Sequence, residues 1–246
     1  MKRLIIMALF LVSLRPVPVA AEELVADLSD HLVEITMGFE GAELLLFGAV
    51  EGEGDVVVLV HGPAEDLTVR RKDKVGPIWM NRGEMSFTGI PAFYRVMSTQ
   101  LPGGWLPDAV RERHQIGIDH LRLPPRDGEA AAAETRVFHD ALIRRKQAVG
   151  HYGTEVGVVK MLSQRLFRTD VAFPTNVPVG NYTVEVFLIE DGRVVSAQTT
   201  PLYISKTGVL AEIFQFAHDY AAVYGILAII FAILAGLGAN AVFRKV

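Results

Sequence analysis

The chain has 246 residues, of which 50% are hydrophobic and 21% charged, with 24 Lys+Arg against 28 Asp+Glu. The resulting net charge of −4 argues against a general nucleic-acid binder, which needs a dominant basic surface, so we expect no nucleic-acid partner. The sequence contains no cysteine, which excludes disulfides, thiolate nucleophiles, zinc–thiolate sites and iron–sulfur clusters.

A secretory signal peptide is predicted at residues 1–21. Lys2 and Arg3 precede an apolar run of 11 residues, which is followed by Pro16, Pro18 and the small residues "VAA". The run is shorter than a membrane helix needs, so we favour cleavage after Ala21 over an uncleaved anchor. Cleavage would leave 21 Lys+Arg against 28 Asp+Glu, a net charge of −7.

Strand patterns fill the first half of the exported domain, residues 22–205. In "HLVEITM", Val33, Ile35 and Met37 alternate with polar residues, as in a half-buried strand. "AELLLFGAV" and "DVVVLV" are apolar on both faces and are separated by the turn-forming "EGEGD", so we predict a central hairpin. The segments "DLTVRRK", "PIWMN", "EMSFTGI" and "AFYRVMS" continue at the spacing of an antiparallel sandwich.

A helical insertion is predicted between about residues 106 and 150. "EAAAAETRVFHDALIRRKQAVG" is rich in good helix formers, and Val137, Ala141 and Ala148 form one apolar stripe. We expect the insertion to lie over the sheet and to cover the outer face of the central hairpin. A shorter helix is expected in "TEVGVVKMLSQRLF".

The domain is predicted to end in a hairpin. Within "GNYTVEVFLIEDGRVVSAQTTPLYIS", Tyr182, Val184 and Val186 share a face, and "EDGR" makes a tight turn. Pro178, Gly180 and Tyr182 form an entry to the first strand that is similar to the corner tyrosine of immunoglobulin-like sandwiches.

Residues 221–243 contain no charged side chain. At about 1.5 Å per residue a helix of this length reaches roughly 34 Å, enough to cross a hydrocarbon core of about 30 Å. Arg244 and Lys245 follow at once, so the positive-inside bias places the tail, residues 244–246, in the cytoplasm and the domain in the periplasm. Residues 206–220 predict an amphipathic juxtamembrane helix. The predicted fold is therefore mainly β: an immunoglobulin-like antiparallel β-sandwich with a helical insertion, followed by one C-terminal transmembrane helix.

Small residues line one ridge of this C-terminal segment, where a second helix could approach closely. We therefore expect the lipid bilayer and a membrane-protein partner, either a permease or a second copy of the chain. The candidate helix-packing face consists of Ala221, Gly225, Ala228, Ala232, Gly236 and Asn240.

Short segments in the same order along nearly the whole mature chain resemble the putative alphaproteobacterial transmembrane protein family. That resemblance implies a signal peptide, an exported domain and a single C-terminal span, and it supplies no activity or catalytic residue. An association of the family with sulfite-exporter type permeases implies a transport accessory role. The segments are "FEGAELLLFGA", "HGP", "VRRK", "IWMN", "PAFYRVMS", "LFR", "PTNVPVGNYTVEV", Lys206 with Gly208, "YG" at 224–225 and "VFRK".

Catalytic motifs are absent from the sequence: there is no Gly-x-Ser-x-Gly elbow, His-Glu-x-x-His, phosphate-binding loop or dinucleotide fingerprint. We therefore expect a protein that is not an enzyme and needs no cofactor. A metal-dependent hydrolase stays open as an alternative, because imidazole and carboxylate ligands suit zinc or copper. Its candidate ligands are the insertion histidines His114, His120, His139 and His151.

Basic residues give a second alternative, a periplasmic module that binds a small anion such as sulfite or phosphate through convergent guanidinium groups. The candidate contacts are Arg70, Arg71, Lys72, Arg144 and Arg145, and Lys146 is adjacent to the last two. A solvated strand face with one paired arginine is the structural alternative. The function that we expect is that of a non-enzymatic accessory or assembly subunit of an inner-membrane complex, such as a transport complex.

Overall fold

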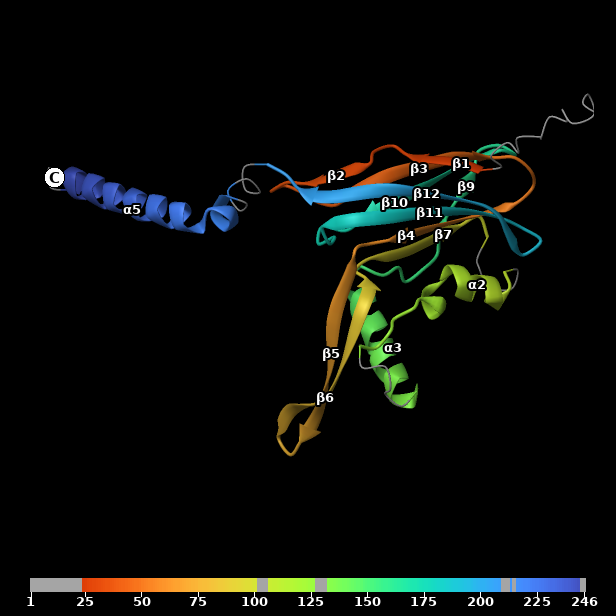
Figure 1. The fold of residues 1–246 in the computed structure, drawn as a ribbon, viewed down its shortest axis with the longest axis horizontal. Coiled ribbons are helices and arrows are strands. Elements are labelled where there is room, and N and C mark those ends of the chain that lie inside the picture. The colour runs from red at the N-terminus through yellow and green to blue at the C-terminus, as the bar shows by residue number, and fades with distance from the viewer. Residues whose placement is uncertain (1–23, 101–105, 127–131, 209–212, 214–215, 244–246) are drawn as a thin grey trace, which may run out of the picture.

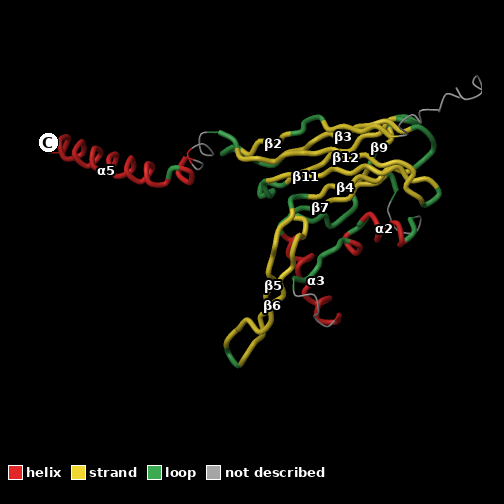
Figure 2. Tube along the Cα trace, viewed as in Figure 1, coloured by secondary structure: helices red, strands yellow, loops and turns green. Residues whose placement is uncertain are grey.

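The computed structural model describes residues 24–100, 106–126, 132–208, 213 and 216–243. The predicted signal peptide, residues 1–21, lies outside the described residues. Strands dominate the described part of the chain, so the prediction of a mainly β protein is confirmed (Figure 2).

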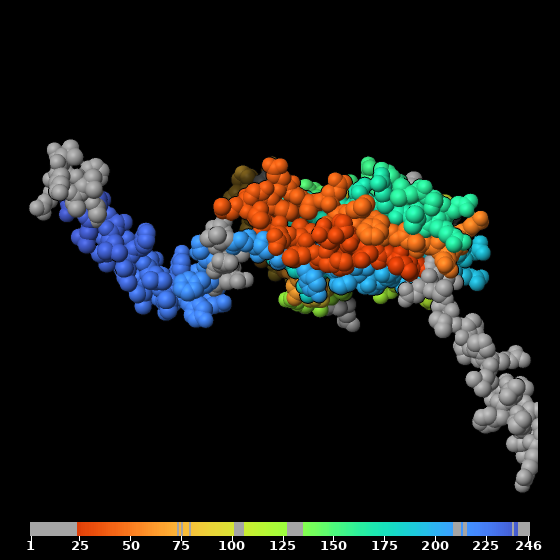
Figure 3. All heavy atoms as spheres, turned by 90° about the horizontal axis from the view of Figure 1, so that it is seen from above, coloured from red at the N-terminus to blue at the C-terminus, as the bar shows by residue number. Residues whose placement is uncertain are grey.

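Two β-sheets pack face to face (Figure 1). The four-stranded sheet has the order β1 (Leu24–Leu28), β3 (Ala42–Val50), β10 (Leu166–Phe173) and β9 (Lys160–Met161). The six-stranded sheet has the order β2 (Leu32–Ile35), β12 (Arg193–Lys206), β11 (Gly180–Glu190), β4 (Asp55–His61), β7 (Tyr94–Ser98) and β8 (Gly157–Val158). The face formed by the N-terminal strands β1 and β3 is seen in Figure 3, coloured red and orange.

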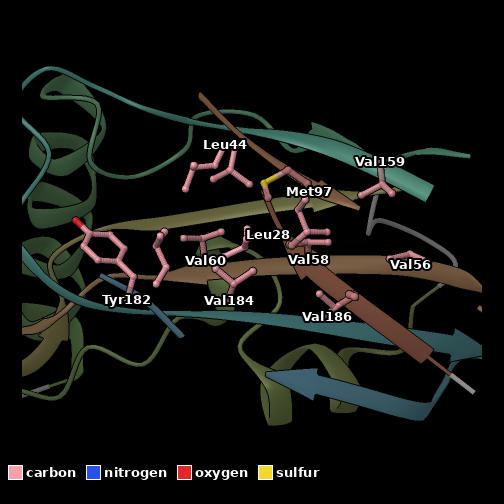
Figure 4. Close-up of a cluster of buried hydrophobic side chains, with 14 of the residues drawn as sticks. Leu28, Leu44, Val56, Val58, Val60, Met97, Val159, Tyr182, Val184 and Val186 are labelled. Carbon is pink, nitrogen blue, oxygen red and sulfur yellow. The ribbon is translucent and has the colours of Figure 1, made fainter. Parts of the chain in front are cut away.

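The space between the two sheets is filled by one cluster of buried apolar side chains (Figure 4). In β10, burial alternates strictly, with Phe167 and Val171 turned inward, as expected for a strand with one solvated face. β4 is buried on both faces, so that Val58 belongs to this cluster and Leu59 to a second cluster on the outer face of the six-stranded sheet. Each such side chain stabilises the fold by about 1.5–3 kcal/mol when removed from water.

The antiparallel prediction is confirmed for the central strand pairs and is wrong at two edges. β12 pairs with β2 in parallel, with Tyr203 opposite Leu32, and β7 pairs with β8 in parallel, with Met97 opposite Gly157. Parallel partners require a long connection, and both of these edge strands are far from their partners in the sequence.

The predicted central hairpin of 42–50 and 55–60 is wrong, because its two strands lie in different sheets. β3 pairs with β1 and β10, whereas β4 pairs with β11 and β7. The turn between them carries the chain from one layer to the other. Two strands that are apolar on both faces give no pattern that would identify their partners, which is why the sequence did not distinguish these arrangements.

Two predicted sandwich strands form a separate ribbon instead. Among the described strands, β5 (Ala64–Val75) pairs with β6 (Ile78–Pro91) alone, in a two-stranded sheet that projects from the sandwich (Figure 1). "PIWMN", except its first residue Pro77, and "EMSFTGI", predicted as two strands, are parts of β6. "AFYRVMS", in contrast, contributes β7 to the six-stranded sheet, as predicted.

The helical insertion contains α2 (Asp108–His114), the 3₁₀ turn η1 (Ile118–His120) and α3 (Ala132–Ala148). Phe138 and Leu142 of α3 pack in the second apolar cluster with Leu59 of β4. The prediction that the insertion covers the outer face of a central hairpin is therefore confirmed for β4, although the hairpin itself does not form. The shorter helix predicted at 154–167 is wrong, since that segment contains β8, β9 and the first residues of β10. Its β-branched valines favour strands.

The late hairpin is confirmed. β11 and β12 are antiparallel, and the turn between them places Asp191 at φ 48° and Gly192 at φ 71°, the left-handed geometry that a tight two-residue hairpin turn requires. The Tyr182 hydroxyl donates a hydrogen bond to the Pro178 carbonyl at 2.6 Å, as a corner tyrosine does. The immunoglobulin-like topology itself stays a prediction.

The helix α5 (Ala221–Phe243) ends the described chain, and Figure 1 draws it apart from the sandwich. Before it, residues 213 and 216–219 are helical, whereas 209–212 and 214–215 lie outside the described residues. β12 extends to Lys206, so the predicted juxtamembrane helix over 206–220 does not begin at its first residue. Within the described part of the chain, no helix combines the length and hydropathy that crossing a membrane requires.

Candidate functional site

The apolar side chains of α5 are exposed around the whole helix. Ile229 and Phe231, which lie on opposite sides of the helix, have exposed fractions of 62% and 78%. The ring of Phe216 lies 5.6 Å from that of Tyr220 and 6.5 Å from that of Tyr224, so that two tyrosines with polar hydroxyl groups lie near the start of the helix. Aromatic residues with a polar end are typical of membrane–water interfaces.

The predicted helix-packing face lies on one side of α5, because its members follow each other at intervals of three or four residues. A Cβ atom added at Gly225 or Gly236 would meet no atom within 4 Å, so this face is open in the described structure. An open face of small residues permits close approach of another helix. Its members are Ala221, Gly225, Ala228, Ala232, Gly236 and Asn240.

A buried lysine of the helical insertion binds to residues at the root of the ribbon. Lys146 of α3 is 6% exposed, and its Nζ forms an ion pair with Glu65 of β5 and donates a hydrogen bond to the Ala92 carbonyl at 3.1 Å. The ammonium group also lies 5.7 Å from the centre of the Tyr152 ring. Lys146 therefore has a structural role, unlike its exposed neighbours Arg144 and Arg145. Sequence reasoning missed this pair because its members are 81 residues apart.

A second polar cluster surrounds Tyr94 on β7. Its hydroxyl donates to the Gln115 carbonyl at 2.5 Å and accepts from the Gly117 amide at 2.9 Å. Burial raises the pKa of Tyr94 well above its usual value, so it stays a neutral phenol. The His61 ring stands edge-on to it with ring centres 5.2 Å apart.

His61 also lines a cavity of about 290 Å³, together with Gln115, Arg122 and residues of the ribbon root. Its Nε2 atom is buried and has no hydrogen-bond partner among the described residues. Burial lowers the pKa of His61, so the neutral imidazole is favoured. The sequence pointed to this position only as part of "HGP", one of the segments on which the family resemblance rests.

Another cavity, of about 280 Å³, lies where β7 and the segment before β8 meet β10. Its wall carries Arg95 together with the acidic residues Glu155 and Asp170. The Arg95 guanidinium lies 5.5 Å from the centre of the Phe93 ring, and burial lowers its pKa. Charges of both signs give this cavity no preference for anions.

The four insertion histidines have separate surroundings. The ring of His114 lies 5.0 Å from that of Phe187, and the Nε2 of His151 is 3.0 Å from the Asn176 carbonyl. His139 faces its neighbour Asp140 at 4.0 Å, and His120 belongs to η1. In the described part of the chain, no group of three His, Asp or Glu residues is placed to hold a metal ion. The metal-dependent hydrolase therefore gains no support from this geometry.

The candidate anion contacts occupy two surfaces. Arg70 and Lys72 are exposed on β5, and the Nε of Arg70 pairs with Glu84 of β6 at 3.1 Å. Arg71 is opposite Gly83 in the ribbon. Arg144 and Arg145 are exposed on α3. None of the five lines either of the two cavities described above.

Comparison with known proteins identifies one family. A family model described as "Putative transmembrane protein (Alph_Pro_TM)" matches residues 23–245. The chain belongs to this family. No curated protein and no solved structure matches the chain.

The family membership agrees with the sequence resemblance, and one of the segments that carry this resemblance has a clear structural reason. "FEGAELLLFGA" contains most of β3, where a Cβ at Gly48 would collide with the Val25 carbonyl and the Phe167 ring. Only glycine lets β1 and β10 close over this point of β3. The glycine in this segment of the Alph_Pro_TM pattern is thus explained by the packing of strands, without a catalytic or binding role.

Proposed function

We propose that this protein is a single-pass inner-membrane protein whose periplasmic domain, residues 22–205, acts as a non-enzymatic accessory or assembly subunit of a membrane complex. Its signal peptide would direct export, and residues 221–243 would cross the bilayer with the tail in the cytoplasm. The partner would be a permease of a transport complex or a second copy of the chain.

The observation that carries the proposal is the uncharged helix of 23 residues, α5, whose apolar side chains, large and small, are exposed around the helix. Such a surface is costly in water and is stable in lipid. The family description, a transmembrane protein, supports the same placement. The open ridge of small residues supports a helix partner, because backbones can approach closely there.

The test is photo-cross-linking within the membrane. A photoreactive residue replaces Ala232, on the small-residue face, or Ile230, which lies about 160° away on the helix. We expect a discrete cross-linked product from position 232, identified by mass spectrometry, and only lipid adducts from position 230. Equal amounts of cross-linked protein from both positions would contradict the prediction that the small-residue face packs against a partner.

A second experiment addresses the complex. A tagged full-length chain is purified in mild detergent beside a chain truncated after Ser205, and the co-purifying proteins are identified. We expect a membrane protein with the full-length chain alone. Retention of the same partner by the truncated chain would assign the contact to the periplasmic domain instead.

Binding of a small anion by the periplasmic domain is a second candidate, favoured by the cavity at His61, which Arg122 also lines. Calorimetry with sulfite, sulfate and phosphate tests it. Arg122→Gln should abolish binding in the cavity, whereas Arg71→Gln with Arg145→Gln should abolish binding at the contacts predicted from sequence. The absence of binding to the unaltered chain would eliminate both sites.

A further inference from the structure

The ribbon leaves the sandwich at the end from which the chain continues toward α5. Pro63, the residue before β5, packs against Gly180, where an added Cβ would lie 2.9 Å from the proline side chain. Gly180 is paired with Ile204, close to the end of β12 at Lys206. The root of the ribbon therefore contacts β11 next to the end of β12, the last strand before the C-terminal segment (Figure 1).

The root of the ribbon packs against the rest of the domain. Met85 and Phe87 are buried, and Gly83 faces the Phe138 ring of α3 at 3.4 Å. From residue 70 to residue 82, which we call the outer ribbon, every residue whose burial is described is exposed. An isolated two-stranded hairpin is marginally stable in water, so a surface that supports the outer ribbon would stabilise it.

The net charge of the outer ribbon is positive, opposite in sign to that of the whole chain. The outer ribbon carries five basic residues and one acidic residue, which leaves 19 Lys+Arg and 27 Asp+Glu for all other positions. At its tip, Ile78 is 63% exposed and Met80 is 51% exposed. The basic residues are Arg70, Arg71, Lys72, Lys74 and Arg82.

This combination fits an anionic lipid surface. Lys and Arg pair with lipid phosphates while their apolar stems lie along the head groups, and apolar side chains beside them enter the interface. An acidic protein surface would complement the basic side chains of the outer ribbon, but it would offer no apolar contact for Ile78 and Met80 at the tip. The outer ribbon would also be close to the membrane surface, because its root lies beside the part of the domain from which the chain continues to the proposed span.

We propose that the outer ribbon lies on the anionic head groups of the membrane that residues 221–243 cross, with Ile78 and Met80 in the head-group region; this rests on the span proposed above. The domain then has two attachments to the membrane, a helix that crosses it and an arm on its surface. Together they fix the orientation of the sandwich above the bilayer.

The cysteine-free chain permits a direct test in the full-length protein. Met80→Cys carries an environment-sensitive fluorophore, and Glu53→Cys, in the turn at the opposite end of the sandwich, is the matched control. Both are reconstituted in vesicles of phosphatidylcholine alone and of phosphatidylcholine mixed with phosphatidylglycerol. We expect a blue shift at position 80 only with phosphatidylglycerol, which is reversed by salt, and none at position 53.

Charge variants of the labelled chain identify the residues responsible. Lys72→Gln with Lys74→Gln should weaken the association of the ribbon roughly fivefold for each charge removed. Arg165→Gln with Arg168→Gln removes the same charge from exposed positions at the far end of the sandwich and should have no effect. Equal effects of the two pairs would overturn the assignment to the ribbon.

Alkaline extraction of the same vesicles separates the two proposals. Release of the full chain by alkali would overturn the span, and the ribbon proposal with it. A retained chain whose label at position 80 stays in water in both kinds of vesicle would overturn the ribbon proposal alone. A label that becomes protected only in native membranes would overturn lipid binding in favour of a protein partner.

Discussion

The ion pair of Lys146 and Glu65 is the residue-scale contact that holds the insertion to the ribbon. Lys146→Ala should lower the free energy of unfolding by about 2–3 kcal/mol, because a buried charge pair loses one member and the Ala92 carbonyl loses its donor. Glu65 is partly exposed, so the cost stays below that of a fully buried pair. Urea unfolding of the domain, residues 22–205, measures the change.

Arg145→Ala is the control for that variant, since it removes the adjacent exposed charge on the same helix and should change the free energy of unfolding by at most about 0.5 kcal/mol. Equal destabilisation by the two substitutions would mean that the helix loses stability through its overall charge and not through the buried contact.

His61 should make the domain less stable in acid. Its pKa is lowered in the folded state by burial, so below its usual value of 6.5 the unfolded chain takes up the proton first and stability falls with pH. Above that value the neutral form is present in both states and this loss disappears. His61→Phe removes the titrating group and keeps an aromatic ring beside Tyr94.

The unfolding midpoint in urea, compared between about pH 7 and about pH 5, should therefore fall less in His61→Phe than in the unaltered chain. A fall of the same size in both proteins would assign the acid sensitivity to His114 or His151, whose pKa values burial also lowers.

At the scale of the elements, the contact of β3 with β1 and β10 depends on Gly48. Gly48→Ala should destabilise the domain by about 1–3 kcal/mol, because the added methyl group meets backbone and a packed ring that have no room to move. Gly38→Ala is the matched control: no atom lies within 4 Å of its Cβ position, so the substitution should be neutral or stabilise by up to about 1 kcal/mol.

Thermal unfolding followed by far-ultraviolet circular dichroism measures both glycine variants. A loss of stability at position 38 as large as that at position 48 would show that glycine is needed in these segments for the backbone and not for close packing.

At the scale of the whole molecule, neither apolar cluster of the described domain extends beyond Ile204, and neither includes a residue of α5. A chain truncated after Gly208 should therefore unfold at the same temperature as the domain of the full-length protein in detergent, and it should be soluble without detergent. Calorimetry of both forms measures this. A lower midpoint for the truncated chain would make α5 part of the folded domain.

The amino-acid sequence by itself determined the features that depend on neighbouring residues. The late hairpin with its turn at Asp191 and Gly192, the helix in the insertion and the uncharged segment 221–243 follow from local periodicity and turn chemistry. The family resemblance needed no structure either, since its segments are read in order along the chain.

Only the tertiary structure decided which elements meet. It placed β3 and β4 in different sheets, and it took the ribbon out of the sandwich. It also paired Lys146 with Glu65 and placed His61 at a cavity with Arg122. The physical reason is the same in each case: these contacts join residues far apart in the chain, and their free energy depends on burial and partners that no local pattern records.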